Sequence, residues 1–292
     1  MWEEGGRLTN EIHIKEGWSL DAKLQRRVQR YGWDKAAAEY ERYWASALEP
    51  AQNRLLQLAE LRRGERVLDV ACGTGLVSFR AASTVGAQGA VMATDISEEM
   101  VNKLRATAES RGLGQVRAER MDAEELALPD GTYDVALCGL GLMYVPDPLA
   151  ALKEMHRALR TGGRVAVAVW GARERCGWAE IFPIVEKRVA SEVCPMFFQL
   201  GQGDALKITM EMAGFDSVVV ERMDAPIRYE NGDEAVGAAF VGGPVALAYS
   251  HFDQATKLAA HAEYLASIAQ YRHGNGYRVA GEFVVGKGIK TG

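Results

Sequence analysis

Two hydrophobic patterns follow one another along the chain, and the first has helical spacing. Apolar side chains in residues 20–64 recur every three or four positions, at Trp33, Ala37, Tyr40 and Trp44. That spacing predicts one face of an α-helix. Pro50 suits the first turn of a second helix, expected over residues 51–61, because its missing N–H costs nothing there.

Beyond residue 65, short apolar runs alternate with helical stretches. Five runs predict strands, over residues 66–71, 89–95, 115–119, 133–139 and 163–170. The helical stretches between them cover residues 75–83, 97–111 and 148–160. Strands that alternate with helices predict parallel βαβ units with right-handed crossovers.

After Trp170 this alternation stops. A helix and two more strands are still expected, over residues 203–213, 217–223 and 282–289. Residues 172–202 show no clear strand, and residues 228–280 predict two helices, at about 232–241 and 254–270.

Composition and charge exclude several classes of protein. The chain has 292 residues, of which 48% are hydrophobic and 25% charged, as in ordinary globular proteins. Its net charge of −5 argues against a dedicated nucleic-acid-binding protein. The apolar runs are far shorter than the ~20 residues of a membrane span. With four cysteines, no CxxC pair and no apolar leader, we expect a cytoplasmic protein.

The candidate chemistry centres on the stretch VLDVACGTG, residues 67–75, where a buried strand runs into a glycine turn and a helix. Gly73 and Gly75 let the backbone approach a ligand closely, and the helix N-terminus offers free N–H groups. The third glycine of a dinucleotide fingerprint is Ser78 here, and Asp69 precedes the turn. That arrangement suits a ligand with a positive charge better than a pyrophosphate.

This stretch resembles motif I of the class I S-adenosylmethionine (SAM)-dependent methyltransferases. Further stretches resemble the family's later motifs in order: ATDIS at 93–97, MDA at 121–123, residues 133–148 and LRTGG at 159–163. The resemblance implies an α/β, Rossmann-like three-layer fold, with a seven-stranded, mostly parallel sheet, an antiparallel last strand and a helical cap. It is closest to the subgroup with ubiquinone and menaquinone C-methyltransferases and small-molecule methyltransferases.

The resemblance also implies SAM as the cofactor and assigns its parts to particular residues. Asp69 and the backbone of residues 71–75 are expected to hold the methionine part, and Asp95 the two ribose hydroxyls. Asp122 is expected to accept a hydrogen bond from the adenine amino group. The complete set of expected cofactor contacts is Tyr40, Trp44, Asp69, Ala71, Cys72, Gly73, Gly75, Asp95, Ile96, Met100, Asp122, Ala123, Cys138 and Gly139.

Methyl transfer from a sulfonium is an in-line displacement, so the protein mainly aligns the reactants and excludes water. A general base is needed only where the acceptor loses a proton during attack. The candidates for such a role are Tyr144 and His251. Met143 and Tyr144 stand where the subgroup often has a pair of histidines, which argues against a histidine mechanism there. No metal site is expected.

Aromatic side chains gather in the segments on either side of the cofactor motifs, which in this family cover the site. They predict an apolar pocket for a small acceptor. Its expected lining includes Trp33, Tyr144, Trp170 and Trp178. The alternative is that most of these rings only build the core of the cap.

These observations divide the chain into a core and a cap. The core is expected over residues 65–171, 203–227 and 282–292, and the cap over the lid 1–64 and the insertions 172–202 and 228–281. The leading hypothesis is a SAM-dependent methyltransferase, a monomer or homodimer, that acts on a small, partly apolar or aromatic molecule. Its alternatives are a non-methylating SAM-binding cyclase or sensor, a nucleic-acid methyltransferase and an NAD-dependent dehydrogenase.

Overall fold

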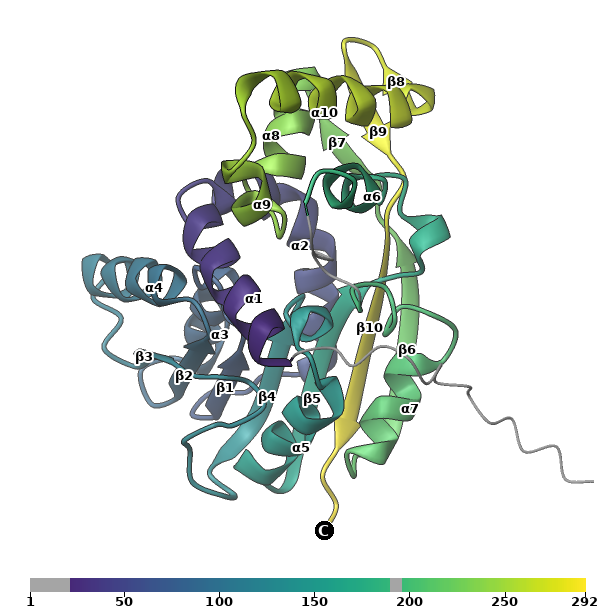
Figure 1. The fold of residues 1–292 in the computed structure, drawn as a ribbon. Coiled ribbons are helices and arrows are strands. Elements are labelled where there is room, and N and C mark those ends of the chain that lie inside the picture. The colour runs from purple at the N-terminus through teal and green to yellow at the C-terminus, as the bar shows by residue number, and fades with distance from the viewer. Residues whose placement is uncertain (1–21, 190–195) are drawn as a thin grey trace, which may run out of the picture.

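A seven-stranded sheet forms the centre of the computed structural model, which describes residues 22–189 and 196–292 (Figure 1). The strand order is β3-β2-β1-β4-β5-β10-β6. In chain order the strands are β1 (Arg66–Val70), β2 (Ala90–Asp95), β3 (Val116–Arg120), β4 (Tyr133–Gly139), β5 (Leu159–Trp170), β6 (Asp216–Asp224) and β10 (Glu282–Ile289). Strand β10 pairs antiparallel with both of its neighbours, whereas the pairs among β1 to β5 are parallel. The predicted fold class is therefore confirmed.

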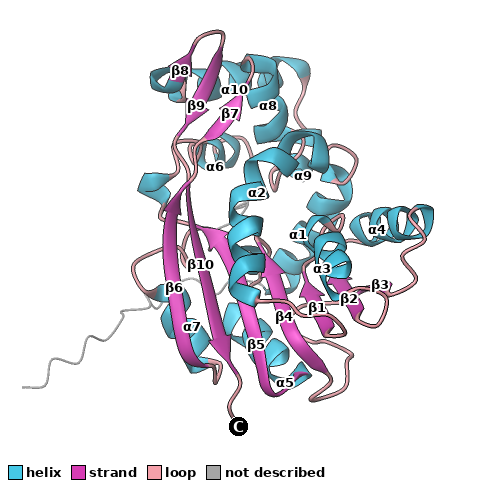
Figure 2. Cartoon of the chain, turned by 180° about the vertical axis from the view of Figure 1, so that it is seen from behind, coloured by secondary structure: helices cyan, strands magenta, loops and turns pink. Residues whose placement is uncertain are grey.

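Helices cover both faces of this sheet and complete three layers. Helices α2 (Tyr40–Ala59) and α3 (Leu76–Val85) lie on one face, as Figure 2 shows. Helices α5 (Pro148–Ala158) and α7 (Ala205–Met212) lie on the other face (Figure 1). Helix α4 (Glu98–Ser110) packs against β2 and β3. None of the helices in the described residues is both long and apolar enough to cross a membrane.

The remaining elements gather beyond the end of the sheet at which β5 ends (Figure 1). They are α1 (Ala22–Ala36), α6 (Ile181–Glu186), α8 (Gly232–Phe240), α9 (Ala246–Ser250), α10 (Gln254–Ser267) and a small antiparallel sheet of β7 (Ile227–Tyr229), β8 (Arg272–His273) and β9 (Gly276–Val279). Short 3-10 turns are η1 (Leu142–Tyr144), η2 (Arg173–Arg175) and η3 (Ala269–Tyr271).

The N-terminal helices differ from the sequence prediction in two ways. Helix α1 ends at Ala36 and α2 begins at Tyr40, so the periodic pattern around them is shared by two helices. Pro50 lies inside α2 and does not start a helix. A proline there removes one backbone hydrogen bond. Burial of neighbouring side chains, Leu48, Ala51 and Leu55, offsets that loss.

The segment 228–280 also differs from the two helices that were predicted for it. It contains three helices, α8, α9 and α10, and most of the small sheet. Strands β7, β8 and β9 have two to four residues each, which is too short to produce a recognisable alternation.

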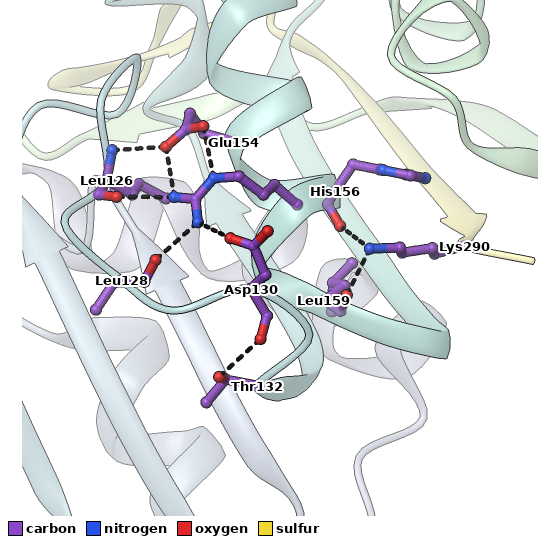
Figure 3. Close-up of polar contacts among 9 residues, drawn as sticks. Leu126, Leu128, Asp130, Thr132, Glu154, His156, Leu159 and Lys290 are labelled. Carbon is purple, nitrogen blue, oxygen red and sulfur yellow. Dashed lines mark hydrogen bonds and ion pairs between the residues drawn. The ribbon is translucent and has the colours of Figure 1, made fainter. Parts of the chain in front are cut away.

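Polar contacts at the end of α5 hold the loop between β3 and β4 (Figure 3). The Arg157 guanidinium donates to the carbonyl oxygens of Leu126, at 2.8 Å, and Leu128, at 2.7 Å, and pairs with Glu154 at 2.7 Å. The same end of α5 is tied to the segment after β10, because Lys290 donates to the carbonyl oxygens of His156 and Leu159. These contacts hold the loop that begins at residue 121 against the end of α5.

Candidate functional site

A cleft of about 740 Å³ opens where β1, β2 and β4 end, at the point where the strand order reverses. Ligands of open α/β sheets bind at such switch points. We call it the strand-end cleft. Its lining includes these residues from the predicted cofactor set: Tyr40, Ala71, Gly73, Asp95, Ile96, Met100, Asp122, Ala123 and Gly139. The predicted contacts Asp69, Cys72, Gly75 and Cys138 are buried and do not belong to this lining, and Trp44 lines a neighbouring pocket.

The turn after β1 has an unusual backbone. Ala71, Gly73 and Gly75 have φ values of 54°, 55° and 96°, in the left-handed region. A Cβ on Gly75 would come within 2.8 Å of Phe79 and 2.9 Å of Leu104, so only glycine fits. On the opposite wall Leu140 has a φ of 70°, and a Cβ on Gly141 would overlap that of Ala71. Non-glycine residues in this region cost conformational energy and cluster at functional sites.

Asp95 ends β2 with its carboxylate fixed toward the glycine turn. Its Oδ2 accepts a hydrogen bond from the Gly73 N–H at 2.8 Å, and its Oδ1 accepts one from the Ser97 N–H at 2.9 Å. Burial raises the pKa of Asp95 to about 6, although these N–H groups oppose the rise. The side chain is therefore a preorganised hydrogen-bond acceptor on the wall of the cleft.

Asp69 is a buried carboxylate in β1, with 1% of its surface exposed. Its Oδ2 accepts a hydrogen bond from the Ser78 hydroxyl at 2.5 Å, while Oδ1 has no partner among the described residues. Burial raises the pKa of Asp69 to about 7. A buried carboxylate oxygen without a partner is costly, so this atom calls for a donor that the protein itself does not supply.

Asp122 follows β3 and connects the cleft to helix α1. The Arg26 Nε lies 2.9 Å from Asp122 Oδ2, and Asp122 Oδ1 accepts a hydrogen bond from the Glu124 N–H at 3.0 Å. Burial raises the pKa of Asp122, and the Arg26 guanidinium opposes that rise. Helix α1 therefore covers one end of the cleft through an ion pair.

A second contact fastens α1 to the start of α4. The Asp34 carboxylate accepts hydrogen bonds from the Ser97 hydroxyl at 2.6 Å and from the Glu99 N–H at 3.2 Å. Ser97 is also the N-cap of α4 and neighbours Asp95 through its N–H. Trp33, the preceding residue of α1, lines the strand-end cleft, so this contact holds in place the helix that carries the indole.

We expect Asp34→Ala to weaken the binding of S-adenosylhomocysteine about 2- to 10-fold, the value of one or two hydrogen bonds. The cause would be a looser α1 over the cleft. Calorimetric titration measures the change, and Lys35→Ala, at an exposed position of the same helix, is the matched control. Equal affinities of the two variants for S-adenosylhomocysteine would show that Asp34 does not hold α1 over the cleft.

An aromatic pocket of about 350 Å³ adjoins the strand-end cleft, and four side chains line both: Trp33, Tyr40, Leu140 and Tyr144. The other residues that line the aromatic pocket are Trp44, Leu48, Met143, Trp170, Trp178, Phe197 and Pro244. The rings pack edge to face, with centroids 5.0 Å apart for Trp33 and Tyr144 and 5.2 Å apart for Tyr144 and Phe197. The predicted acceptor residues Trp33, Tyr144, Trp170 and Trp178 thus come together here.

His251 lies elsewhere. It is exposed at the end of α9 and lines neither the strand-end cleft nor the aromatic pocket. In the part of the chain that the structure describes, no three metal-ligating side chains converge on one point. Cys138 is buried, and burial raises its pKa to about 12, so the thiol stays protonated.

The sequence prediction missed Arg26 and Gln29, which line the strand-end cleft from α1. Arg26 belongs to a cluster of basic residues with Lys23, Arg27 and Arg30, which is typical of a solvated helix face. A usable signal was present, because Arg26, Gln29 and Trp33 follow the spacing of one helix face.

Comparison with known proteins agrees with this geometry. Residues 67–163 match a family described as a methyltransferase domain. Aklanonic acid methyltransferase of Streptomyces sp. (strain C5) is 34% identical over 146 residues, which are 50% of this chain and 66% of that protein. Demethylmenaquinone methyltransferase of Geobacillus kaustophilus is 38% identical over 109 residues, 37% of this chain and 47% of that protein. This chain belongs to the class I SAM-dependent methyltransferases.

Solved structures share the fold of this chain. The phosphoethanolamine N-methyltransferase 2 of Haemonchus contortus, in complex with S-adenosylhomocysteine, has a TM-score of 0.60 and 16% identity. The match covers 94% of this chain and 61% of that chain. The curated relatives above are matched over about half to two thirds of their own length. SAM is the cofactor of this family.

Proposed function

We propose that this protein transfers a methyl group from SAM to a small, partly apolar or aromatic molecule held in the aromatic pocket. One observation carries the proposal: the strand-end cleft and the aromatic pocket meet at Trp33, Tyr40, Leu140 and Tyr144. A methyl donor in the first would therefore face an acceptor in the second.

The donors and acceptors of the strand-end cleft complement those of SAM. Asp95 offers a fixed carboxylate for the two ribose hydroxyls. The unpaired Oδ1 of Asp69 suits the methionine ammonium, directly or through water. Ile96 and Met100 would pack on the adenine, and Asp122 and Ala123 would contact its edge. When bound, SAM supplies a methyl group on a positively charged sulfur.

The aromatic pocket would align the acceptor and exclude water. Within residues 22–189 and 196–292, no acidic or basic side chain lines it, and the titratable groups on its lining are the hydroxyls of Tyr40 and Tyr144. Burial, reinforced by the nearby Asp95 carboxylate, raises the pKa of Tyr40, which keeps that phenol neutral. Positioning then provides most of the catalysis, as an in-line displacement requires, and Tyr144 would contact the acceptor.

The names of the relatives support a small acceptor. One is named for aklanonic acid and another for demethylmenaquinone, both of which are small molecules. We propose that the acceptor of the present chain is a small molecule as well.

Two measurements test the proposed function. Calorimetric titration with SAM, S-adenosylhomocysteine and NAD should show binding of the first two alone, and binding of NAD alone would overturn the proposal. Release of S-adenosylhomocysteine should then be screened across phenols, amines, thiols and quinols. Binding of SAM with no release on any acceptor would favour a non-methylating cyclase or sensor.

A further inference from the structure

Two indole N–H groups in the cap are buried without a hydrogen-bond partner. They belong to Trp44, in α2, and Trp178, in the loop before α6, whose side chains are 8% and 4% exposed. Among the described residues, neither Nε1 atom has an acceptor. The ring centroids lie 6.3 Å apart. Buried donors are nearly always paired, so two neighbouring exceptions need an explanation.

Both indoles line the aromatic pocket in the part that is not shared with the strand-end cleft. Each of the described residues that line this pocket is uncharged. A charged ligand would lose its hydration there without a compensating partner, which is strongly unfavourable. A neutral oxygen, in contrast, would give the two indole groups the acceptor that the protein lacks.

We infer that Trp44 and Trp178 bind an oxygen atom, most simply a carbonyl oxygen, of an uncharged planar acceptor molecule. That oxygen lies at the end of the aromatic pocket away from the cofactor, and the methylated atom lies at the end that the pocket shares with the strand-end cleft. The inference rests on the proposed function and adds the chemical class of the acceptor and the residues that select it.

Three naphthalenes of nearly equal shape test this inference: 2-acetylnaphthalene, 2-ethylnaphthalene and 2-naphthoate. They carry a carbonyl, no oxygen and a carboxylate at the same position. With S-adenosylhomocysteine present, calorimetry should show that the wild type binds the acetyl compound about 5- to 10-fold more tightly than the ethyl compound, the value of a hydrogen bond. The naphthoate should bind about 10-fold more weakly than the acetyl compound, or not at all.

Trp44→Phe and Trp178→Phe each remove one N–H group and keep an aromatic ring. Each should reduce the ratio of the affinities for the acetyl and ethyl compounds at least about twofold. In the double variant this ratio should be close to one. Leu48→Val, in the same pocket, is the control that changes shape without removing a donor. This variant should bind both the acetyl and the ethyl compound more weakly, by a similar factor, so that the preference between them stays the same.

The outcomes separate this inference from the proposed function. If both Phe variants keep the wild-type preference, or if the wild type does not distinguish the compounds, the role of the indoles is overturned. Tightest binding of the naphthoate would overturn the uncharged acceptor. Either result with intact binding of S-adenosylhomocysteine leaves the proposed function standing, whereas loss of that binding in the wild type would overturn the proposed function itself.

Discussion

Asp95→Ala is expected to weaken the binding of S-adenosylhomocysteine by about 1–3 kcal/mol, or about 5- to 150-fold. The variant would lose the acceptor proposed for the ribose hydroxyls. It would also free the Gly73 and Ser97 N–H groups, whose hydrogen bonds to Asp95 fix the glycine turn and the start of α4. Calorimetric titration measures the loss directly.

A second aspartate provides the control for this variant. Asp134, at the start of β4, accepts a hydrogen bond from the Arg66 N–H at 2.7 Å and lines neither cavity. Asp134→Ala should lower the free energy of unfolding without changing the affinity for S-adenosylhomocysteine. Equal affinities of Asp95→Ala and the wild type would show that Asp95 is not part of the cofactor site.

The sheet and the strand-end cleft could be predicted from the sequence because their determinants are local. The turn after β1 depends on a few consecutive residues that include Gly73 and Gly75, whose left-handed φ values other residues resist. The carboxylate of Asp95 follows directly from its place at the end of β2. Each strand, turn and helix of this kind depends on one short stretch of consecutive residues. It can therefore be recognised from the sequence alone.

The aromatic pocket depends on contacts between distant segments. Its rings come from α1, α2, η1, the end of β5 and residues around 178 and 197. Periodicity indicates that such side chains are buried but not which of them meet. The contacts of Arg26 with Asp122 and of Asp34 with Ser97 could not be predicted for the same reason, because they join residues far apart in the sequence.

The affinity for SAM is expected to fall in two steps as the pH is lowered from 7.5 to 5. Burial raises the pKa of Asp69 to about 7 and that of Asp95 to about 6, so each carboxylate becomes neutral within this range. A neutral Asp69 no longer attracts the methionine ammonium. Below pH 7 the affinity for SAM should therefore fall by up to about tenfold per pH unit. The fall should end when the affinity reaches that of the protein with a neutral Asp69.

Asp69→Asn should abolish the upper step and keep the lower one, near pH 6, that belongs to Asp95. The free energy of unfolding should also depend on the protonation of Asp69. Because the pKa of folded Asp69 is above its unfolded value of about 3.9, its contribution to stability is complete below that value and is lost as the pH rises through about 7. The free energy of unfolding, measured in urea, should then decrease more steeply over this range in the wild type than in Asp69→Asn. Identical pH profiles of the two proteins, in both affinity and unfolding, would show that Asp69 does not titrate in this way.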